Sequence, residues 1–124
     1  YKNTPLVAEK PLVWVGSSLS DIKAFPPDAR RKAGHKLYQV QIGLAPSDWK
    51  PMPSIGPGVV EIRLRTRLQH RVFYLAKFVE AVYVLHSFQK TSRKTPSADF
   101  ELGKRRLGEV MRLRGRGAGG SRET

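Results

Sequence analysis

Three consecutive runs of alternating or apolar residues, joined by connections of only a few residues, occupy positions 59–89 of the chain. In the first run, VVEIRLR at 59–65, apolar side chains fall on one face and charged ones on the other, as in a half-buried strand. The second run, HRVFYLAKF at 70–78, also alternates, whereas AVYVLHSFQ at 81–89 is apolar on both faces, as a central strand is. Strands with such short connections pair with their neighbours, so the sequence predicts a three-stranded antiparallel meander.

The segments on both sides of this meander predict one further strand and three helices. PLVWV at 11–15 is a short apolar run typical of a strand. Two helices are predicted at 17–26 and 27–43, because a proline pair divides them and Gly43 can cap the second one. They form a helical hairpin. A last helix is predicted to begin at Thr95-Pro96, with threonine as the cap and proline at the first helical position.

The predicted order of elements, β-α-α-β-β-β-α, defines an α+β fold in which helices pack on an antiparallel sheet. Residues 11–113 are predicted to form a single domain, preceded by an N-terminal tail at 1–10. The Gly/Arg-rich segment 114–124 is predicted to be a flexible tail, since it can bury little apolar area. The proline-rich segment 44–58 is predicted to have no regular structure, and loops of this length are often functional.

Charge is the strongest global feature of the chain. Lys and Arg together number 23 against 10 acidic residues, for a net charge of +13. Such a field attracts polyanions, of which nucleic acid is the first candidate, followed by an acidic protein partner or an anionic membrane surface. The alternative is a basic surface that only keeps the protein soluble.

Several classes of protein are disfavoured by what the sequence lacks. There is no cysteine, and the 3 histidines have no spacing typical of a zinc pair, so we expect no metal site and no cofactor. No apolar run approaches the ~20 residues that span a bilayer. The N-terminal residues show no signal-peptide pattern, so a cytoplasmic protein without a membrane partner is expected.

The polar residues of the meander are arranged as clusters of charge. Glu61, Arg63 and Arg65 share one face of the first strand, and Arg71 begins the next one. By alternation, one face of the third strand carries His86, Phe88 and Lys90. Because neighbouring strands lie ~4.8 Å apart, side chains at the same level can reach one phosphate or adjacent ones.

Each of these residues also has a purely structural interpretation. Arg63 and Arg65 could form a solvated strand face with Glu61 as their ion-pair partner. His86 could be a core histidine whose hydrogen bonds are satisfied, and Lys90 could be a solvated loop charge. Together they favour a site, because the mutual repulsion of clustered cations requires an anion or an acid to offset it.

The pattern Glu-x-Arg, Arg-Val-x-Tyr, Leu-His-x-Phe-x-Lys…Lys-Thr-Pro resembles the RelE/HigB superfamily of type II toxins, specifically its phage-derived HigB-like branch. The resemblance extends over residues 11–113 in the order of elements, and the last-strand motif is its most specific part. The residues that carry it are Glu61, Arg63, Arg71, Val72, Tyr74, Leu85, His86, Phe88, Lys90, Lys94, Thr95 and Pro96. Where this family often has a second lysine after the one at Lys90, this chain has Thr91.

The resemblance implies a toxin that cleaves mRNA on the ribosome without a metal ion. It also implies neutralisation by a HigA-like helix-turn-helix antitoxin, through which the toxin would contact operator DNA only indirectly. The predicted catalytic residues are Arg63, Arg71, His86 and Lys90. The predicted RNA-binding residues are Lys50, Arg65, Tyr74, Phe88, Arg93 and Lys94.

The roles expected for these residues follow from the chemistry of RNA cleavage. Arg63 and Arg71 are phosphate clamps, because a planar guanidinium matches phosphate oxygens bidentately. Lys90 is a transition-state cation or a proton carrier, and His86 is a secondary acid–base candidate. Tyr74 and Phe88 could stack on bases or pack in the core.

Two alternatives to a nuclease remain open. One is a non-catalytic relative that binds only RNA or its antitoxin, and the other is a basic DNA-binding repressor. The last helix is predicted to have a basic face that consists of Arg105, Arg106, Arg112 and Arg114. Arg71 is expected to be mostly solvated, so replacing it with alanine should change the free energy of unfolding by less than about 1 kcal/mol.

Overall fold

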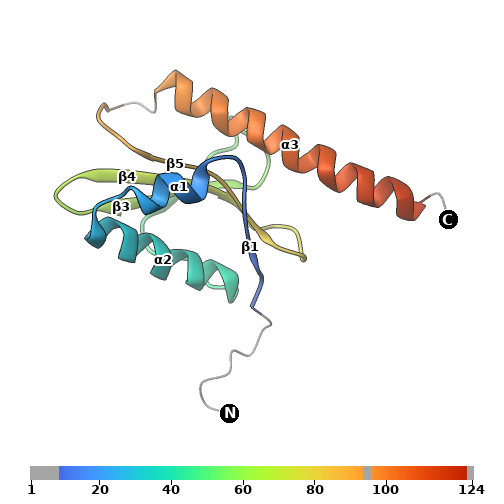
Figure 1. Cartoon of the computed structure of the whole chain (residues 1–124), viewed down its shortest axis with the longest axis horizontal. Coiled ribbons are helices and arrows are strands. Elements are labelled where there is room, and N and C mark those ends of the chain that lie inside the picture. Colours follow the sequence, from blue (N-terminus) through green and yellow to red (C-terminus); the bar gives the residue numbers. More distant parts are fainter. Residues whose placement is uncertain (1–8, 94–95, 123–124) are drawn as a thin grey trace, which may run out of the picture.

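The computed structural model describes residues 9–93 and 96–122, with side chains described as far as residue 116. A five-stranded sheet with strand order β1-β5-β4-β3-β2 forms its centre (Figure 1). The strands are β1 Leu12–Trp14, β2 Trp49–Pro51, β3 Val59–Arg65, β4 Gln69–Leu75 and β5 Val82–Gln89. The predicted meander of β3, β4 and β5 is confirmed, because both of its strand pairs are antiparallel.

Helices cover both faces of this sheet. The short helix α1 (Ser18–Lys23) and helix α2 (Pro27–Gln41) lie on one face, and the long helix α3 (Ser97–Arg122) lies on the other (Figure 1). Each side has its own apolar core, one around Leu37 of α2 and one around Val110 of α3. The α+β fold class is therefore confirmed. In the described part of the chain, no helix is both long and apolar enough to cross a bilayer.

The strand β5 contacts helices on both faces, as its continuous apolar sequence predicts. Its pairing with β4 is interrupted by a bulge, because Phe73 pairs with His86 whereas the next residue, Tyr74, pairs with Val84. Leu85 is thus an extra residue in β5, and it joins the core on the α3 side. Strict alternation would have placed it on the opposite face from His86.

Three details of the predicted fold are wrong. The proline-rich segment contains the strand β2, which pairs with the edge of β3 although all three of its residues are exposed. The first strand pairs with β5 in parallel, so the sheet is not entirely antiparallel. The last helix does not end near residue 113 but continues to Arg122. Thr95, the predicted cap of α3, lies outside the described residues.

Helix α2 ends in the way that its glycine predicts. Gly43 has a φ of 87°, a left-handed conformation that glycine adopts without steric cost. Its N–H donates to the carbonyl of Val40, and the N–H of Leu44 donates to the carbonyl of Gln39, at 3.0 and 2.8 Å. These two bonds form a Schellman motif, which satisfies the last carbonyls of the helix.

Two glycines of this region should respond to alanine in opposite directions. Gly43→Ala forces a side chain into the left-handed region and should lower the free energy of unfolding by about 1–2 kcal/mol. Gly34→Ala is the matched control, because Gly34 lies inside α2 with open space around an added Cβ. It should raise the free energy of unfolding by about 0.5–1 kcal/mol. Urea unfolding measures both, and equal effects of the two substitutions would contradict the cap.

Candidate active site

Arginines from two neighbouring strands face each other in the sheet. Arg63 of β3 pairs with Arg71 of β4, and Arg71 pairs with Phe88 of β5. Side chains of directly paired antiparallel residues point to the same face. Phe88 belongs to the apolar core on the α3 side, so both arginines lie on the face that α3 covers.

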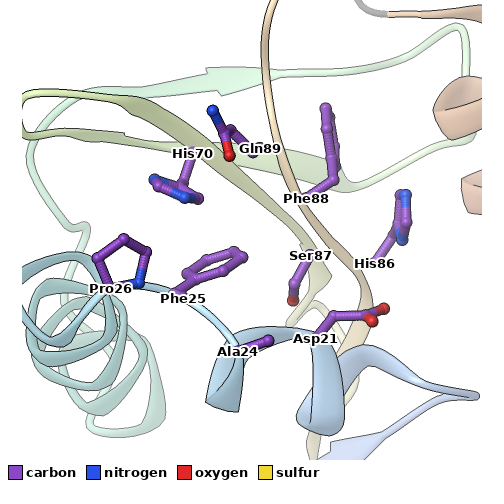
Figure 2. A pocket seen from close by; sticks show the side chains of 9 residues that line it. All are labelled: Asp21, Ala24, Phe25, Pro26, His70, His86, Ser87, Phe88 and Gln89. Atoms are coloured by element: carbon purple, nitrogen blue, oxygen red, sulfur yellow. The ribbon is translucent and has the colours of Figure 1, made fainter.

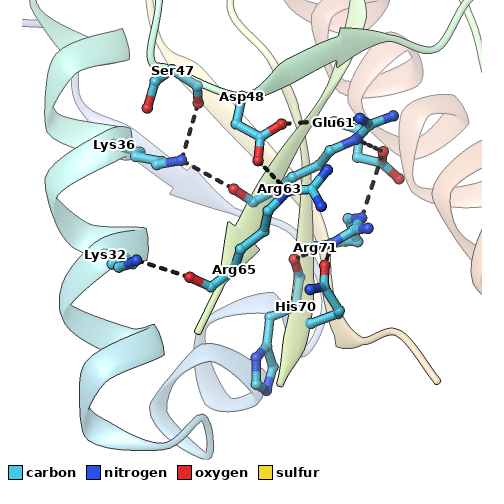
Figure 3. A network of polar contacts seen from close by, with 10 residues as sticks. Lys32, Lys36, Ser47, Asp48, Glu61, Arg63, Arg65, His70 and Arg71 are labelled. Carbon is cyan, nitrogen blue, oxygen red and sulfur yellow. Dashed lines mark hydrogen bonds and ion pairs between the residues drawn. The ribbon is translucent and has the colours of Figure 1, made fainter. Parts of the chain in front are cut away.

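The carboxylate of Glu61 lies between these two arginines (Figure 3). Its Oε1 atom is 3.5 Å from Nε of Arg63 and 3.7 Å from Nε of Arg71. Only 3% of Glu61 is exposed, so little water screens these ion pairs. One buried carboxylate therefore offsets the repulsion between two facing guanidinium groups. The structural alternative drawn from the sequence paired Glu61 with Arg63 and Arg65. The structure confirms Arg63 as a partner of Glu61, but the second partner is Arg71.

Arg71 is buried, which corrects the expectation that it is mostly solvated. It is 5% exposed, and its Nη1 donates to Oε1 of Gln69 at 3.2 Å and to the carbonyl of His70 at 3.0 Å. Its Nε has no hydrogen-bond partner, because Glu61 is too distant for a hydrogen bond. Arg71→Ala would leave the carboxylate of Glu61 buried without its nearest buried counter-charge, so it would destabilise the fold by more than the sequence suggested.

A hollow of about 370 Å³ opens beside Arg71, at the start of β4 and just after the end of β5. The residues that line it are Gln69, Arg71, Lys90, Thr91, Ser92 and Arg93. The N–H of Lys90 donates to the carbonyl of Gln69 at 2.8 Å, which places Lys90 one strand away from Arg71. Arg93 lines the same hollow as Thr91. An arginine thus lines the hollow near Thr91, where the family resemblance implied a second lysine.

The amine of Lys90 has an unusual electrostatic environment. Partial burial lowers its pKa below the ordinary value, and the charge of Arg71 lowers it further, against the opposing effect of Glu61. Arg63 and Lys50 add to the lowering. Lys50 of β2 is the register partner of Glu61, so these charges come from four strands or strand ends. We call Lys50, Arg63, Arg71, Lys90 and Arg93 the basic cluster.

Arg65 is paired with a second carboxylate, Asp48, which also approaches Arg63 of the basic cluster. The Nε of Arg65 donates to Oδ2 of Asp48 at 2.6 Å, and Nη1 of Arg63 is 3.9 Å from the other oxygen of Asp48 (Figure 3). Asp48 has a φ of 58°, in a region that aspartate tolerates better than most residues. Sequence analysis missed Asp48, because it lies in the proline-rich segment, where no periodicity indicates which side chains face the sheet.

His86 is fully engaged within the protein. Its Nε2 is 2.6 Å from Oδ1 of Asp99, and its Nδ1 is 3.4 Å from Nη1 of Arg106. Since arginine only donates, Nδ1 accepts and Nε2 carries the proton that it donates to Asp99. The ring is 5% exposed and stacks on Phe88 at 4.9 Å. This arrangement is that of the satisfied core histidine that the sequence left open.

Arg106 does not lie on the exposed face of α3, where the sequence placed it. It is 8% exposed, and it donates to the carbonyl of Leu85 and to Oγ of Ser17, both at 3.0 Å. A Cβ at Gly16 would lie 2.6 Å from its Nε, so the absence of a side chain there makes room for the guanidinium. Arg106 therefore ties α3 to β5 and to the start of α1.

The aromatic residues expected to stack on bases are part of the two cores. Tyr74 lies on the opposite face from Arg71, in the core beside α2, and burial raises its pKa to about 12. Phe88 is buried against the rings of Phe73 and His86. Core packing is therefore the interpretation of both residues that the structure supports. Lys94 lies outside the described residues.

A metal site is not evident in the part of the chain that the structure describes. Within residues 9–93 and 96–122, no three or more His, Cys, Asp or Glu residues come together as a group that could hold an ion. The charged side chains that do converge are cations around one buried carboxylate. Such a site is suited to binding an anion, since guanidinium and ammonium groups only donate hydrogen bonds.

The sheet flanked by helices, with a row of arginines from β3 and β4 and a lysine after β5, places the chain among small basic α+β proteins of RelE-like fold. Residues 20–108 match the sequence family described as Phage derived protein Gp49-like (DUF891). The chain belongs to this family, a HigB-like toxin family of the RelE superfamily. Among curated proteins, no sequence match to the chain was found.

Removing the charge of Glu61 should destabilise the protein strongly. Glu61→Gln leaves Arg71 buried without a counter-charge and should lower the free energy of unfolding by about 3–5 kcal/mol. The double variant Glu61→Gln/Arg71→Gln should lose less free energy of unfolding than the two single variants together, because the two side chains interact directly.

An exposed ion pair provides the control for this experiment. Glu80 pairs with Arg114 at the surface, and such pairs contribute little to stability, so Glu80→Gln should leave the unfolding curve nearly unchanged. Equal stability of Glu61→Gln and the parent protein would contradict the buried ion pair.

Proposed function

We propose that this protein is the toxin of a type II toxin–antitoxin system, an endoribonuclease that cleaves mRNA on the ribosome. The observation that carries the proposal is the convergence of Arg63, Arg71 and Lys90 around Glu61, beside an open hollow. Membership of a HigB-like toxin family supports the same function. The ribosome is the expected site of action, so the activity would take place in the cytoplasm.

Charge balance supports an anionic substrate at this place. The basic cluster has five cationic side chains against the one carboxylate of Glu61, which leaves a net charge of +4. Arg65 is already paired with Asp48 and changes this balance little. A phosphate with its neighbours would reduce the repulsion among the cations and accept hydrogen bonds from them. RNA provides such phosphates together with a 2′-hydroxyl that can act as a nucleophile.

The proposed reaction needs no group other than these side chains and water. The 2′-oxygen attacks the adjacent phosphorus, the P–O5′ bond breaks, and the products are a 2′,3′-cyclic phosphate and a 5′-hydroxyl. Lys90 in its neutral form takes the proton of the 2′-hydroxyl, and water protonates the leaving 5′-oxygen. Arg63 and Arg71 neutralise the charge that develops on the phosphorane oxygens. His86 takes no part, because both of its ring nitrogens already have partners.

The proposed partner is a HigA-like helix-turn-helix antitoxin with an acidic segment. Such a segment would neutralise the toxin by covering Arg71 and Lys90, since buried like charges require a counter-charge. Contact with operator DNA would be indirect, through the antitoxin. Direct DNA binding is less well supported, because Arg106 of the basic last helix is buried in the fold.

A second candidate is a non-catalytic relative that binds RNA or the antitoxin by the same surface. The engagement of His86 favours it, because the site then contains no free histidine for proton transfer. The two candidates share their binding residues and differ in cleavage. Primer extension on mRNA from translating ribosomes mixed with the purified chain therefore distinguishes them.

Arg71→Lys should abolish most cleavage while retaining the fold. Lysine keeps the positive charge beside Glu61, but it cannot donate two parallel hydrogen bonds to a phosphate. We expect cleavage at least ~10²-fold slower, measured by primer extension in single turnover. Arg67→Lys in the exposed turn between β3 and β4 is the matched control and should cleave normally. Loss of cleavage only in proportion to lost folded protein would assign Arg71 a structural role alone.

The proton-transfer role of Lys90 predicts a pH dependence with a definite sign. The neutral amine is the active form, so the cleavage rate should rise with pH up to the lowered pKa of Lys90 and level off above it. Lys90→Arg stays charged throughout and should lose this rise together with ~10²-fold in rate. A Lys90→Arg variant with the parent pH profile would limit Lys90 to an electrostatic role.

A further inference from the structure

Three buried side-chain atoms in the described part of the chain have no hydrogen-bond partner, and all lie at the same end of the sheet. They are Nδ1 of His70, Nε of Arg71 and Oγ of Ser87. Arg71 borders the hollow of the proposed active site. The other two residues border a second hollow on the other side of β5. A buried polar atom without a partner destabilises the folded state unless a ligand supplies the missing hydrogen bond.

This second hollow, the β5-edge hollow, lies where α1 approaches the end of β5 (Figure 2). Its volume is about 390 Å³, within the range of about 300–1,000 Å³ that is typical of small-molecule sites. The residues of its wall that could bind a ligand are Asp21, Phe25, His70, Ser87, Phe88 and Gln89. The strand β1 pairs with β5 only as far as Val84, so it does not cover this part of the strand.

Aromatic rings border the β5-edge hollow on both sides of Ser87 (Figure 2). Phe25 and His70 form one pair, with ring centroids 4.3 Å apart. His86 and Phe88 form the other pair, stacked with an interplanar angle of 17°. A flat ligand would thus meet apolar ring surfaces as well as polar atoms.

The polar groups of the hollow can both donate and accept hydrogen bonds. The hydroxyl of Ser87 does either. Burial lowers the pKa of His70, so its ring is neutral near pH 7 and has one donor and one acceptor nitrogen. The carboxylate of Asp21 already accepts a hydrogen bond from Ser17 at 2.8 Å and has further acceptor capacity. These donors and acceptors match the polar edge of a heteroaromatic ring, and the neighbouring aromatic side chains match its flat faces.

The β5-edge hollow and the proposed active site share the end of β5 as a common wall. Phe88 of the hollow is the register partner of Arg71, and Gln89 of the hollow immediately precedes Lys90. The two hollows lie on opposite faces of the sheet, since Arg71 faces α3 whereas Ser87 is the register partner of Val72 in the core beside α2. They approach each other around the end of β5 that β1 leaves uncovered. An RNA strand that places a phosphate at Arg71 and Lys90 can pass around this uncovered end and bring a neighbouring base to the β5-edge hollow.

We propose that the β5-edge hollow binds one unstacked nucleobase of the RNA, next to the phosphate held by Arg71 and Lys90. Ser87 and His70 form hydrogen bonds with the edge of the base, and the rings of Phe25 and His70 lie against it. Proteins commonly recognise single-stranded RNA in this way, by combining stacking with hydrogen bonds to exposed base edges. The inference rests on the proposed function for the identity of the nucleic acid, but the hollow can be tested without cleavage.

The first experiment measures binding of free nucleosides, which carry no phosphate and so do not depend on the basic cluster. Adenosine, guanosine, cytidine and uridine are titrated separately into the full chain, and the resonances of the His70 ring and the Ser87 amide are followed by NMR. We expect saturable shifts with at least one nucleoside. Ser87→Ala should weaken that binding by about fivefold, the effect of one lost hydrogen bond.

Two serines provide a matched pair of variants. Ser18 is buried like Ser87, but its Oγ donates to the carbonyl of Val84 at 3.1 Å. Ser18→Ala should therefore lower the melting temperature by about 3–6 °C and leave nucleoside binding unchanged. Ser87→Ala should not lower the melting temperature, because it removes an atom without a partner. His70→Phe, which keeps the ring without its nitrogens, should resemble Ser87→Ala in both measurements.

The second experiment compares cleavage sites across a library of mRNA codons. Ser87→Ala and His70→Phe should flatten the preference for the base beside the cleaved bond, while Ser18→Ala keeps it. The outcomes of the two experiments separate the two proposals. If nucleosides shift the His70 resonances but the protein cleaves no RNA, the base-binding hollow is supported and the nuclease activity is overturned. If the protein binds no nucleoside and Ser87→Ala and His70→Phe keep the parent base preference, the base-binding hollow is overturned and the nuclease activity still stands. Protection of His70 and Ser87 by the antitoxin, without nucleoside binding, would assign the hollow to the protein partner and overturn the inference.

Discussion

Glu61 holds together two strands whose facing side chains would otherwise repel each other. Arg63 and Arg71 are direct register partners in β3 and β4, a position where like charges destabilise a sheet. The buried carboxylate next to them allows both guanidinium groups to remain on the face covered by α3. The rest of the basic cluster gathers around this group, because β2 and the end of β5 bring Lys50 and Lys90 to the same place.

The strand β5 connects this cluster with the remainder of the molecule. At one end it pairs with β1 and accepts hydrogen bonds from Ser18 and Arg106, which fasten the helices on both faces. At the other end, its residues border the two hollows. The first half of β5 is thus fixed by hydrogen bonds, whereas buried polar atoms near its last residues have no hydrogen-bond partner. Local rules of polar satisfaction are most often broken at functional sites, which agrees with the placement of both proposals there.

The histidine of the last-strand motif shows how a conspicuous residue can have a structural task. His86 lies between a carboxylate and a guanidinium of α3, and its ring stacks on Phe88. These contacts fix the start of α3 next to the site, close to the segment that carries Lys90. The side chain therefore positions the end of β5, where Lys90 and the rest of the basic cluster lie.

The sequence by itself determined the meander, the helices on its flanks and the strand face shared by Glu61, Arg63 and Arg65. These features follow from the alternation of apolar and polar residues and from prolines and glycines, which act over a few neighbouring positions. The family motif likewise identified the end of β5 as the place of interest. Resemblance and alternation both placed Lys90 next to the arginines.

Only the tertiary structure decided which of the charges are buried and with what they pair. Asp48 reaches Arg65 because β2 pairs with β3 directly after it. Arg106 reaches the carbonyl of Leu85 because Gly16 has no side chain that would occupy the place of the guanidinium. Neither contact has a local signature, since each joins segments far apart in the chain. The bulge at Leu85 had no signature either, because an apolar residue fits both faces of a strand that is covered on both sides. Burial and pairing are properties of the packed molecule, and a one-dimensional pattern can indicate the face of a strand but not what lies against it.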